Sequence, residues 1–256
     1  MINNLIYLIC YSYYVITMNP FVSESMIKSY AVGGQEIHIQ LEPGIFCPST
    51  HGSKLADYIN VKSGEHVLDM GTGTGLLGIV AAKQGGIVDV SDPFKKAVDL
   101  AIKNAQLNNV TVNGYVGEYF CTSRQTYDYI IANLPQEILP ISYVKQIGDL
   151  ETTISGGQKG NQHLLTFLEQ AHIHMDNNSR ALIAAYSVSD YITTLNKMKL
   201  LYAPKLLDVI TSPAKDFVQE NFQIYKPLIE TGDVGLFKKD GLWQSTIFVY
   251  ELKKKK

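Results

Sequence analysis

Three short segments of this sequence have residue types that could bind a ligand or orient a reacting group. They are a glycine-rich run at residues 69–75, an Asp-Pro pair at 92–93 and the tetrapeptide Asn-Leu-Pro-Gln at 133–136. Glycine permits positive φ and has no Cβ, so a flat or charged ligand can lie against such a turn. Carboxylate and carboxamide oxygens accept hydrogen bonds from hydroxyl and amino groups. The first expectation is therefore a nucleotide-like cofactor.

The spacing of the glycines narrows the choice of cofactor. Residues 66–84, HVLDMGTGTGLLGIVAAKQ, predict a strand, a tight turn and a helix. A dinucleotide fingerprint requires Gly-x-Gly-x-x-Gly, but the pattern here is Asp-x-Gly-x-Gly-x-Gly from Asp69 to Gly75, and position 76 is Leu76. The spacing argues against a nicotinamide dinucleotide.

A second strand is predicted at residues 87–91, and it ends next to Asp92. This aspartate lies 21 residues beyond Gly71, and Pro93 begins a helix whose apolar side includes Phe94 and Ala97. A carboxylate at this position can accept hydrogen bonds from the two hydroxyls of a ribose. It can also act as the helix N-cap, and both roles can hold together because a carboxylate has two oxygens.

Two further strands bring polar residues to the same predicted edge. Residues 110–116 form a strand that precedes Glu118 and Tyr119, and residues 129–132 form a buried strand that ends at Asn133. Ligands of open α/β sheets bind at the carboxyl ends of the strands. The alternatives are a solvated loop carboxylate for Glu118 and an Asx-type turn for Asn133.

Several of these segments resemble motifs of one enzyme class. VLDMGTGTG looks like motif I of class I S-adenosylmethionine methyltransferases, and Asn-Leu-Pro-Gln is similar to the Asn-Pro-Pro-Tyr motif of the release-factor glutamine N-methyltransferase (PrmC/HemK-like) family. Residues 154–175 resemble that family's Gly-Gly-x-x-Gly segment and the helix after it. The matches keep the family's order over residues 40–187.

The resemblance implies an α/β fold with a Rossmann-like, seven-stranded, mostly parallel sheet. Its strand order would be 3-2-1-4-5-7-6, with strand 7 antiparallel and helices on both faces. Strands 5, 6 and 7 would be residues 180–187, 205–211 and 243–253. A Pro-containing loop with Pro48, which ends near Thr50 and Ser53, would flank the methionine end of the cofactor, although the family's acidic residue is missing there. Thr50 or Ser53 could also simply cap the helix that follows.

The resemblance also assigns roles to residues. S-adenosylmethionine would be the cofactor, and the residues expected to bind it are Thr50, Asp69, Gly71, Thr72, Gly73, Gly75, Asp92, Pro93, Glu118, Tyr119 and Asn133. Asn133, Leu134, Pro135 and Gln136 would form the catalytic segment. The Asn133 side-chain oxygen and the Leu134 carbonyl would accept hydrogen bonds from an acceptor NH2, and Pro135 would fix the turn. Gln136 replaces the family's stacking aromatic residue and could instead hydrogen-bond a polar acceptor.

Composition limits the other possibilities. The formal net charge is −2, from 22 basic and 24 acidic residues, which argues against a strong global attraction for nucleic acid. The three cysteines are far apart, and no Cys-x-x-Cys occurs, so we expect neither disulfides nor a metal site, and a reducing, cytoplasmic setting. The apolar run within residues 1–20 is shorter than the roughly 20 residues of a membrane span and has no basic residue before it.

The predicted organisation is an N-terminal extension at 1–27 and one methyltransferase domain at 28–256. The extension is either a docked element or the product of a start codon placed too early, with Met18 as the true beginning. Residues 28–46 predict a hairpin with Ile37, Ile39 and Leu41 on one face. Residues 212–242 predict either a lid over the acceptor or a packed surface loop.

The predicted activity is methylation of an amide or amine nitrogen, with a protein glutamine-like acceptor favoured. A small amino-acid-like acceptor methylated on nitrogen or sulfur, and adenine in nucleic acid, are the enzymatic alternatives. A cofactor-binding scaffold subunit is the non-enzymatic one. A small partner protein or a homodimer is compatible with the sequence, and no membrane association is expected.

Overall fold

A computed structural model of the chain describes residues 21–122 and 124–255, without the side chains of residues 50 and 51. The predictions made for residues 1–20 lie outside the described residues. The strands of the central sheet are β3 (His66–Met70), β4 (Ile87–Asp92), β5 (Asn113–Val116), β6 (Tyr129–Ala132), β7 (Arg180–Tyr186), β8 (Tyr202–Pro213), β9 (Phe237–Lys239) and β10 (Leu242–Lys254).

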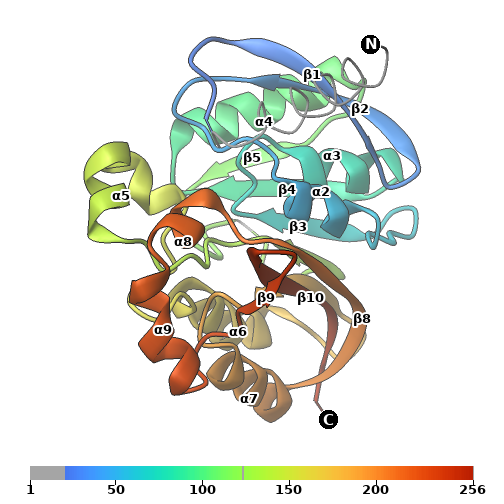
Figure 1. The fold of residues 1–256 in the computed structure, drawn as a ribbon. Coiled ribbons are helices and arrows are strands. Elements are labelled where there is room, and N and C mark those ends of the chain that lie inside the picture. Colours follow the sequence, from blue (N-terminus) through green and yellow to red (C-terminus); the bar gives the residue numbers. More distant parts are fainter. Residues whose placement is uncertain (1–20, 123, 256) are drawn as a thin grey trace, which may run out of the picture.

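The sheet has the predicted strand order. Along the sheet the strands follow as β5-β4-β3-β6-β7-β10-β8, and β9 pairs with β10 as an addition (Figure 1). The pairs β5–β4, β4–β3, β3–β6 and β6–β7 are parallel, whereas β10 runs antiparallel to β7, β8 and β9. This confirms the Rossmann-like fold and the antiparallel last long strand, and it adds one short strand that was not predicted.

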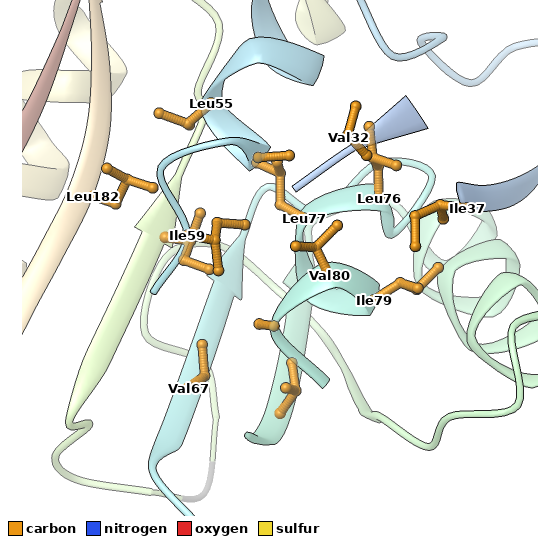
Figure 2. Close-up of a cluster of buried hydrophobic side chains, with 14 of the residues drawn as sticks. Val32, Ile37, Leu55, Ile59, Val67, Leu76, Leu77, Ile79, Val80 and Leu182 are labelled. Atoms are coloured by element: carbon orange, nitrogen blue, oxygen red, sulfur yellow. The ribbon is translucent and has the colours of Figure 1, made fainter. Parts of the chain in front are cut away.

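Helices cover both faces of the sheet (Figure 1). They are α2 (Thr50–Ala56), α3 (Leu76–Lys83), α4 (Lys95–Leu107), α5 (Ile141–Ile147), the 3-10 helix η1 (Gly148–Thr153), α6 (Gln162–His174), α7 (Tyr191–Leu201), α8 (Asp216–Glu220) and α9 (Phe222–Glu230). The strands are apolar on both sides because each face is covered, so successive side chains enter different cores. Val67 of β3 joins the core on the α2 and α3 side, shown in Figure 2, and Leu68 joins the core against α6.

The predicted hairpin forms and lies on the α3 and α4 side of the sheet. Strands β1 (Met26–Val32) and β2 (Gln35–Leu41) pair antiparallel, and Ile37, Ile39 and Leu41 are buried, as predicted. Asn104 of α4 holds β2 in place. Its carboxamide accepts from Gln40 N at 2.8 Å, and it donates to Gln40 O at 3.0 Å and to Thr74 O at 2.9 Å. One buried side chain thereby joins the hairpin to the glycine-rich loop.

The structure corrects three boundary predictions. Helix α2 is capped by Ser49, whose hydroxyl accepts from Gly52 N at 2.9 Å, and not by Thr50 or Ser53, because the helix already begins at Thr50. Helix α4 begins at Lys95, so Phe94 precedes it and is 44% exposed instead of joining its apolar side. Strand β5 begins at Asn113, three residues after the predicted start.

The segment between β8 and β10 is folded over most of its length. It contains α8, α9 and β9, and a separate apolar cluster forms beneath it from buried residues of this segment and of the chain after β6 and β7. That cluster consists of Ile138, Val188, Ala214, Phe217, Val218, Tyr225, Val234 and Leu236. A lid function for this segment stays a prediction.

Candidate functional site

The registers of the parallel strands align three of the predicted site residues. Met70 at the end of β3 is the partner of Ser91 in β4 and of Ala132 in β6. The residues that follow these three positions are Gly71, Asp92 and Asn133, so all three leave the sheet at the same edge. They also line one cavity of about 420 Å³.

The glycine-rich loop has the backbone conformation that its sequence predicts. Gly71, Gly73 and Gly75 have φ values of 67°, 52° and 86°. These values lie in the left-handed region that side chains disfavour. A Cβ at Gly75 would also lie 2.9 Å from the Cα of Ala101, so α4 packs directly on this glycine.

Asp69 supports the loop from beneath instead of lining the cavity. Its Oδ2 accepts from the Thr72 hydroxyl at 2.7 Å and from Gly78 N at 2.8 Å. Burial raises the pKa of Asp69 to about 6, the Thr72 and Gly78 hydrogen bonds oppose that rise, and the nearby charge of Asp92 adds to it. The arrangement fits a role in shaping the loop better than the predicted direct contact with a cofactor.

Asp92 faces the cavity and is partly engaged by the main chain. Oδ1 accepts from Phe94 N at 3.0 Å, and Oδ2 accepts from Gly73 N at 3.1 Å. Burial raises its pKa, and these two amide hydrogen bonds partly offset the effect. Because each carboxylate oxygen can accept more than one hydrogen bond, both oxygens can still receive a hydroxyl. Asp92 is not the N-cap of α4 as predicted, because Phe94 holds that position, but its bond to Phe94 N just before the helix leaves room for a ligand contact.

The remaining residues predicted at this end also line the cavity, except Gly75, which packs against α4 instead. Thr72, Pro93, Glu118 and Tyr119 belong to its wall, whereas the side chain of Thr50 lies outside what the structure describes. Tyr119 has a positive φ of 49°, and its hydroxyl lies 3.0 Å from Nδ1 of His163. The sequence did not point to His163, because this residue belongs to α6 and lies 44 residues after Tyr119 along the chain.

We call the wall formed by residues 71–74, Asp92, Glu118 and Tyr119 the glycine-loop end of the cavity. The polar atoms of this wall fit a nucleoside. The Asp92 carboxylate faces a cavity that the glycines leave open, and within the described residues the buried Ser91 hydroxyl has no hydrogen-bond partner. A carboxylate, an unsatisfied hydroxyl and the two glycines Gly71 and Gly73 in the wall suit a ligand that carries hydroxyl groups and a flat ring.

Asn133 is held between two residues that the sequence analysis did not identify. Its Oδ1 accepts from the Tyr186 hydroxyl at 3.3 Å. On the other side, a Cβ at Gly52 would lie 2.7 Å from its Nδ2, so the missing side chain of Gly52 makes room for the carboxamide. Leu134 packs near Gly71, where a Cβ would meet its Cδ2 at 3.0 Å. Asn133 and Leu134 therefore adjoin the glycine loop.

Gln136 has a different role from the one predicted. Its side chain donates to Ala184 O at 2.8 Å, and its Oε1 accepts from Tyr186 N at 3.0 Å. The residue is 1% exposed. Its carboxamide extends the hydrogen bonding between the ends of β6 and β7 and is directed to the sheet instead of an acceptor. The structure thus corrects the expectation that Gln136 contacts the substrate, and the aromatic ring beside Asn133 is that of Tyr186.

An ion pair between a buried carboxylate and a half-buried lysine lies in the same wall. Glu137 follows the tetrapeptide, and its Oε1 lies 2.6 Å from Nζ of Lys215, which precedes α8. We call Asn133, Glu137, Tyr186 and Lys215 the Asn133 end of the cavity. Burial and the charge of Glu137 raise the pKa of Tyr186, so its hydroxyl stays protonated and able to donate. Neither Tyr186 nor Lys215 belongs to a local motif, and only the fold brings them here.

Neither a metal-type cluster nor a membrane-spanning helix occurs in the described parts of the chain. No group of three His, Cys, Asp or Glu side chains there could hold a metal ion. Over the same residues, no helix combines the length and apolarity needed to cross a bilayer.

Comparisons with known proteins agree with this geometry. The family model for ribosomal protein L11 methyltransferase (PrmA) matches residues 14–155. A Methanocaldococcus jannaschii protein, provisionally named a protein N5-glutamine methyltransferase, is 32% identical over 170 residues, which cover 64% of this chain and 84% of that protein. The ribosomal protein L11 methyltransferase of Nitratiruptor sp. is 34% identical over 126 residues, and the match covers 47% of this chain but only 44% of that protein.

Solved structures share the fold. A Streptococcus mutans structure, provisionally described as an S-adenosylmethionine-dependent methyltransferase, has a TM-score of 0.53 at 16% identity and covers 90% of this chain and 56% of that chain. One from Bacillus halodurans, provisionally described as a methyltransferase, has a TM-score of 0.52 at 14% identity and covers 79% and 98%. At these identities the similarity concerns the fold.

Proposed function

The chain belongs to the family of the L11 methyltransferase (PrmA) model and is an S-adenosylmethionine-dependent methyltransferase, and from that premise we propose that it methylates an uncharged amide nitrogen of a protein, such as a glutamine side chain. The observation that carries the proposal is the placement of Asn133. Its fixed carboxamide lies in one cavity with Asp92 and the glycine loop. The name of the M. jannaschii relative supports the same acceptor.

The glycine-loop end would hold the cofactor. Asp92 would accept hydrogen bonds from the ribose hydroxyls, Glu118 would accept one from the adenine amine, and Gly71 and Gly73 would leave room for the ligand. When bound, S-adenosylmethionine supplies an electrophilic methyl group on a sulfonium. The protein then has to hold the acceptor nitrogen in line and keep its own nucleophiles away.

Asn133 and Leu134 would orient the acceptor. The lone pair of an amide nitrogen is delocalised, so the nitrogen is a weak nucleophile. The Asn133 Oδ1 and the Leu134 carbonyl oxygen can accept the two N–H bonds of a carboxamide, which directs the lone pair into the cavity and stabilises positive charge as it develops. Tyr186 leaves Oδ1 one further acceptor site, and it prevents the Asn133 side chain from rotating.

The charges around Asn133 agree with an uncharged acceptor. Glu137 and Lys215 neutralise each other at 2.6 Å. The formal net charge of the chain is −2, which gives a nucleic acid no overall attraction. The correction at Gln136 also removes the direct contact that a small amino-acid-like acceptor was expected to make.

The test is to incubate the protein with cofactor labelled in its methyl group and with fractionated cell extract. We expect label in protein, and acid hydrolysis should release it as methylamine, because an N-methylated side-chain amide hydrolyses whereas a methylated lysine survives. The Asn133→Ala variant is the control for label transferred by other enzymes. Label that enters nucleic acid, the small-molecule pool or acid-stable methyl-lysine would contradict the proposal.

A further inference from the structure

Glu137 is a carboxylate held rigidly in the cavity wall next to the catalytic segment. Its main chain is fixed on both sides, since Glu137 N donates to Ile154 O at 3.2 Å and Gly156 N donates to Glu137 O at 2.9 Å. Its side chain is 6% exposed. A carboxylate buried to this extent is costly unless a cation or several donors accompany it.

The cation comes from a distant part of the chain. Lys215 precedes α8, and its Nζ lies 2.6 Å from the Glu137 carboxylate and 5.5 Å from the ring centre of Phe46. Among the described residues, no other cation comes within ion-pair distance of Glu137. The neighbouring main chain fixes this position, because Ala214 N donates to Trp243 O at 2.8 Å and Val218 N donates to Lys215 O at 2.9 Å.

The surroundings of Glu137 would attract an ammonium group if Lys215 were absent. Phe46, Glu137 and Tyr186 line the same cavity as Asn133. A carboxylate among aromatic rings is a favourable environment for an organic cation, through ion pairing and cation–π attraction. Lys215 already occupies that environment, and it would repel a second ammonium at the same place.

We propose that Lys215 determines the specificity of this enzyme by neutralising Glu137, so that the Asn133 end of the cavity accepts an uncharged carboxamide and rejects a protonated amine. The inference deepens the proposed function and rests on it. The ion pair of Lys215 is with Glu137 and not with Asn133 or the glycine loop, so we expect its effect on selectivity to be electrostatic. If Lys215 only held α8 in place, its replacement would lower the stability of the protein without changing the preference between amide and amine.

The test compares two small probes that differ mainly in charge, butyramide and butylammonium. Their binding to the wild-type protein and to variants is followed by NMR titration, which needs no turnover. We expect wild-type protein to prefer butyramide. The Lys215→Met variant should bind butylammonium about tenfold more tightly than wild type, because it leaves the Glu137 carboxylate unpaired.

Three further variants separate specificity from stability. Lys215→Arg keeps the charge and should keep the wild-type preference, whereas the double variant Glu137→Gln with Lys215→Met should return to within about twofold of wild type, since the two changes are coupled. Lys159→Met is the matched control, because Lys159 also pairs with a buried carboxylate, that of Asp190, at 3.3 Å but lies outside the cavity wall. It should leave both affinities unchanged.

Thermal unfolding by circular dichroism reports whether each variant is folded. If folded Lys215→Met binds butylammonium no better than wild type does, or if Lys159→Met changes the preference equally, the inference is wrong. The proposed function is tested separately with two end-blocked peptides that differ only by one glutamine or one lysine. Failure of the wild type to methylate the glutamine peptide, with the probe preference intact, would refute the proposed acceptor and leave the electrostatic selection standing.

Discussion

The two ends of the cavity are built in different ways. The glycine-loop end is assembled from short consecutive segments that follow the aligned ends of three neighbouring strands, β3, β4 and β5. The Asn133 end combines residues of the β6 terminus with Tyr186 from β7, Lys215 from the segment before α8 and a vacancy at Gly52 in α2. Local sequence encodes the first end, and only the completed tertiary structure creates the second. Substitutions should therefore separate cofactor binding from acceptor chemistry.

The largest expected effect is at Asn133. The Asn133→Ala variant should lower kcat by about a hundredfold to a thousandfold, because a pre-oriented hydrogen-bond acceptor at the reacting nitrogen is lost. Cofactor affinity measured by calorimetry should stay close to that of the wild type. A variant that loses cofactor binding to the same extent would show that the two ends are not separable.

The reciprocal experiment is at Asp92. Asp92→Ala should weaken cofactor binding at least about a hundredfold, since two hydrogen bonds from hydroxyls to a carboxylate are removed, and the lower bound of about 1.5 kcal/mol for each gives that factor. The Asp92→Asn variant keeps one acceptor oxygen and should retain part of the affinity. Unchanged affinity in Asp92→Ala would exclude this residue from the ribose.

Gly52 tests whether the Asn133 end depends on the absence of a side chain in α2. Gly52→Ala places a Cβ within 2.7 Å of the Asn133 Nδ2 and should displace the carboxamide. We expect kcat to fall by about tenfold or more, because small displacements of a positioning group are costly. Gly235→Ala is the matched control, since its added Cβ would have an ordinary contact of 3.4 Å with Ser187. Equal effects of the two variants on kcat would contradict the proposed displacement of the Asn133 carboxamide.

A smaller effect is expected at Tyr186. Tyr186→Phe keeps the ring and removes the hydrogen bond to Asn133, so kcat should fall by about twofold to tenfold, as expected for one neutral hydrogen bond. Tyr143→Phe removes another tyrosine hydroxyl whose pKa is raised by burial and by Glu137, but one that has no contact with Asn133. It should leave kcat unchanged, and a similar loss there would point to a general electrostatic effect.

The last prediction concerns the stability of the glycine-loop end and not turnover. Burial raises the pKa of Asp69 to about 6, above its value near 3.9 in an unfolded chain. The folded state therefore holds this proton at pH values where the unfolded state has lost it. The contribution of Asp69 to the free energy of unfolding is fully present below about pH 4 and is lost as the pH rises through about 6.

Asp69→Asn cannot ionise, so its unfolding free energy should fall less steeply between pH 4 and 7. Between pH 4 and 7 the unfolding free energy of the wild type should fall by about 2 kcal/mol more than that of Asp69→Asn. Denaturant unfolding of both proteins at a series of pH values measures it. Parallel pH profiles would show that Asp69 does not titrate in this range.

The same contrast explains what the sequence could predict. Asp92, Asn133 and the glycines could be located, because each directly follows an apolar strand and the strand order places the strand ends together. The role of Gln136 could not be predicted, since its partners lie in β7, about 50 residues along the chain, and a buried glutamine has no distinctive sequence pattern. Lys215 and Tyr186 were missed for the same reason. The cap at Ser49 differed by one residue from the predicted Thr50, because several hydroxyl residues are adjacent there.

The position of β10 has a consequence for the order of folding during synthesis. This strand lies between β7 and β8, so β8 has no hydrogen-bonded neighbour in the sheet until β10 arrives. Residues 242–254 leave the ribosome after every other strand of the sheet. A nascent chain can therefore form the half of the sheet that carries Asp92 and Asn133 before β10 supports the main chain next to Lys215. The ion pair between Lys215 and Glu137, which we propose selects the substrate, would then form last.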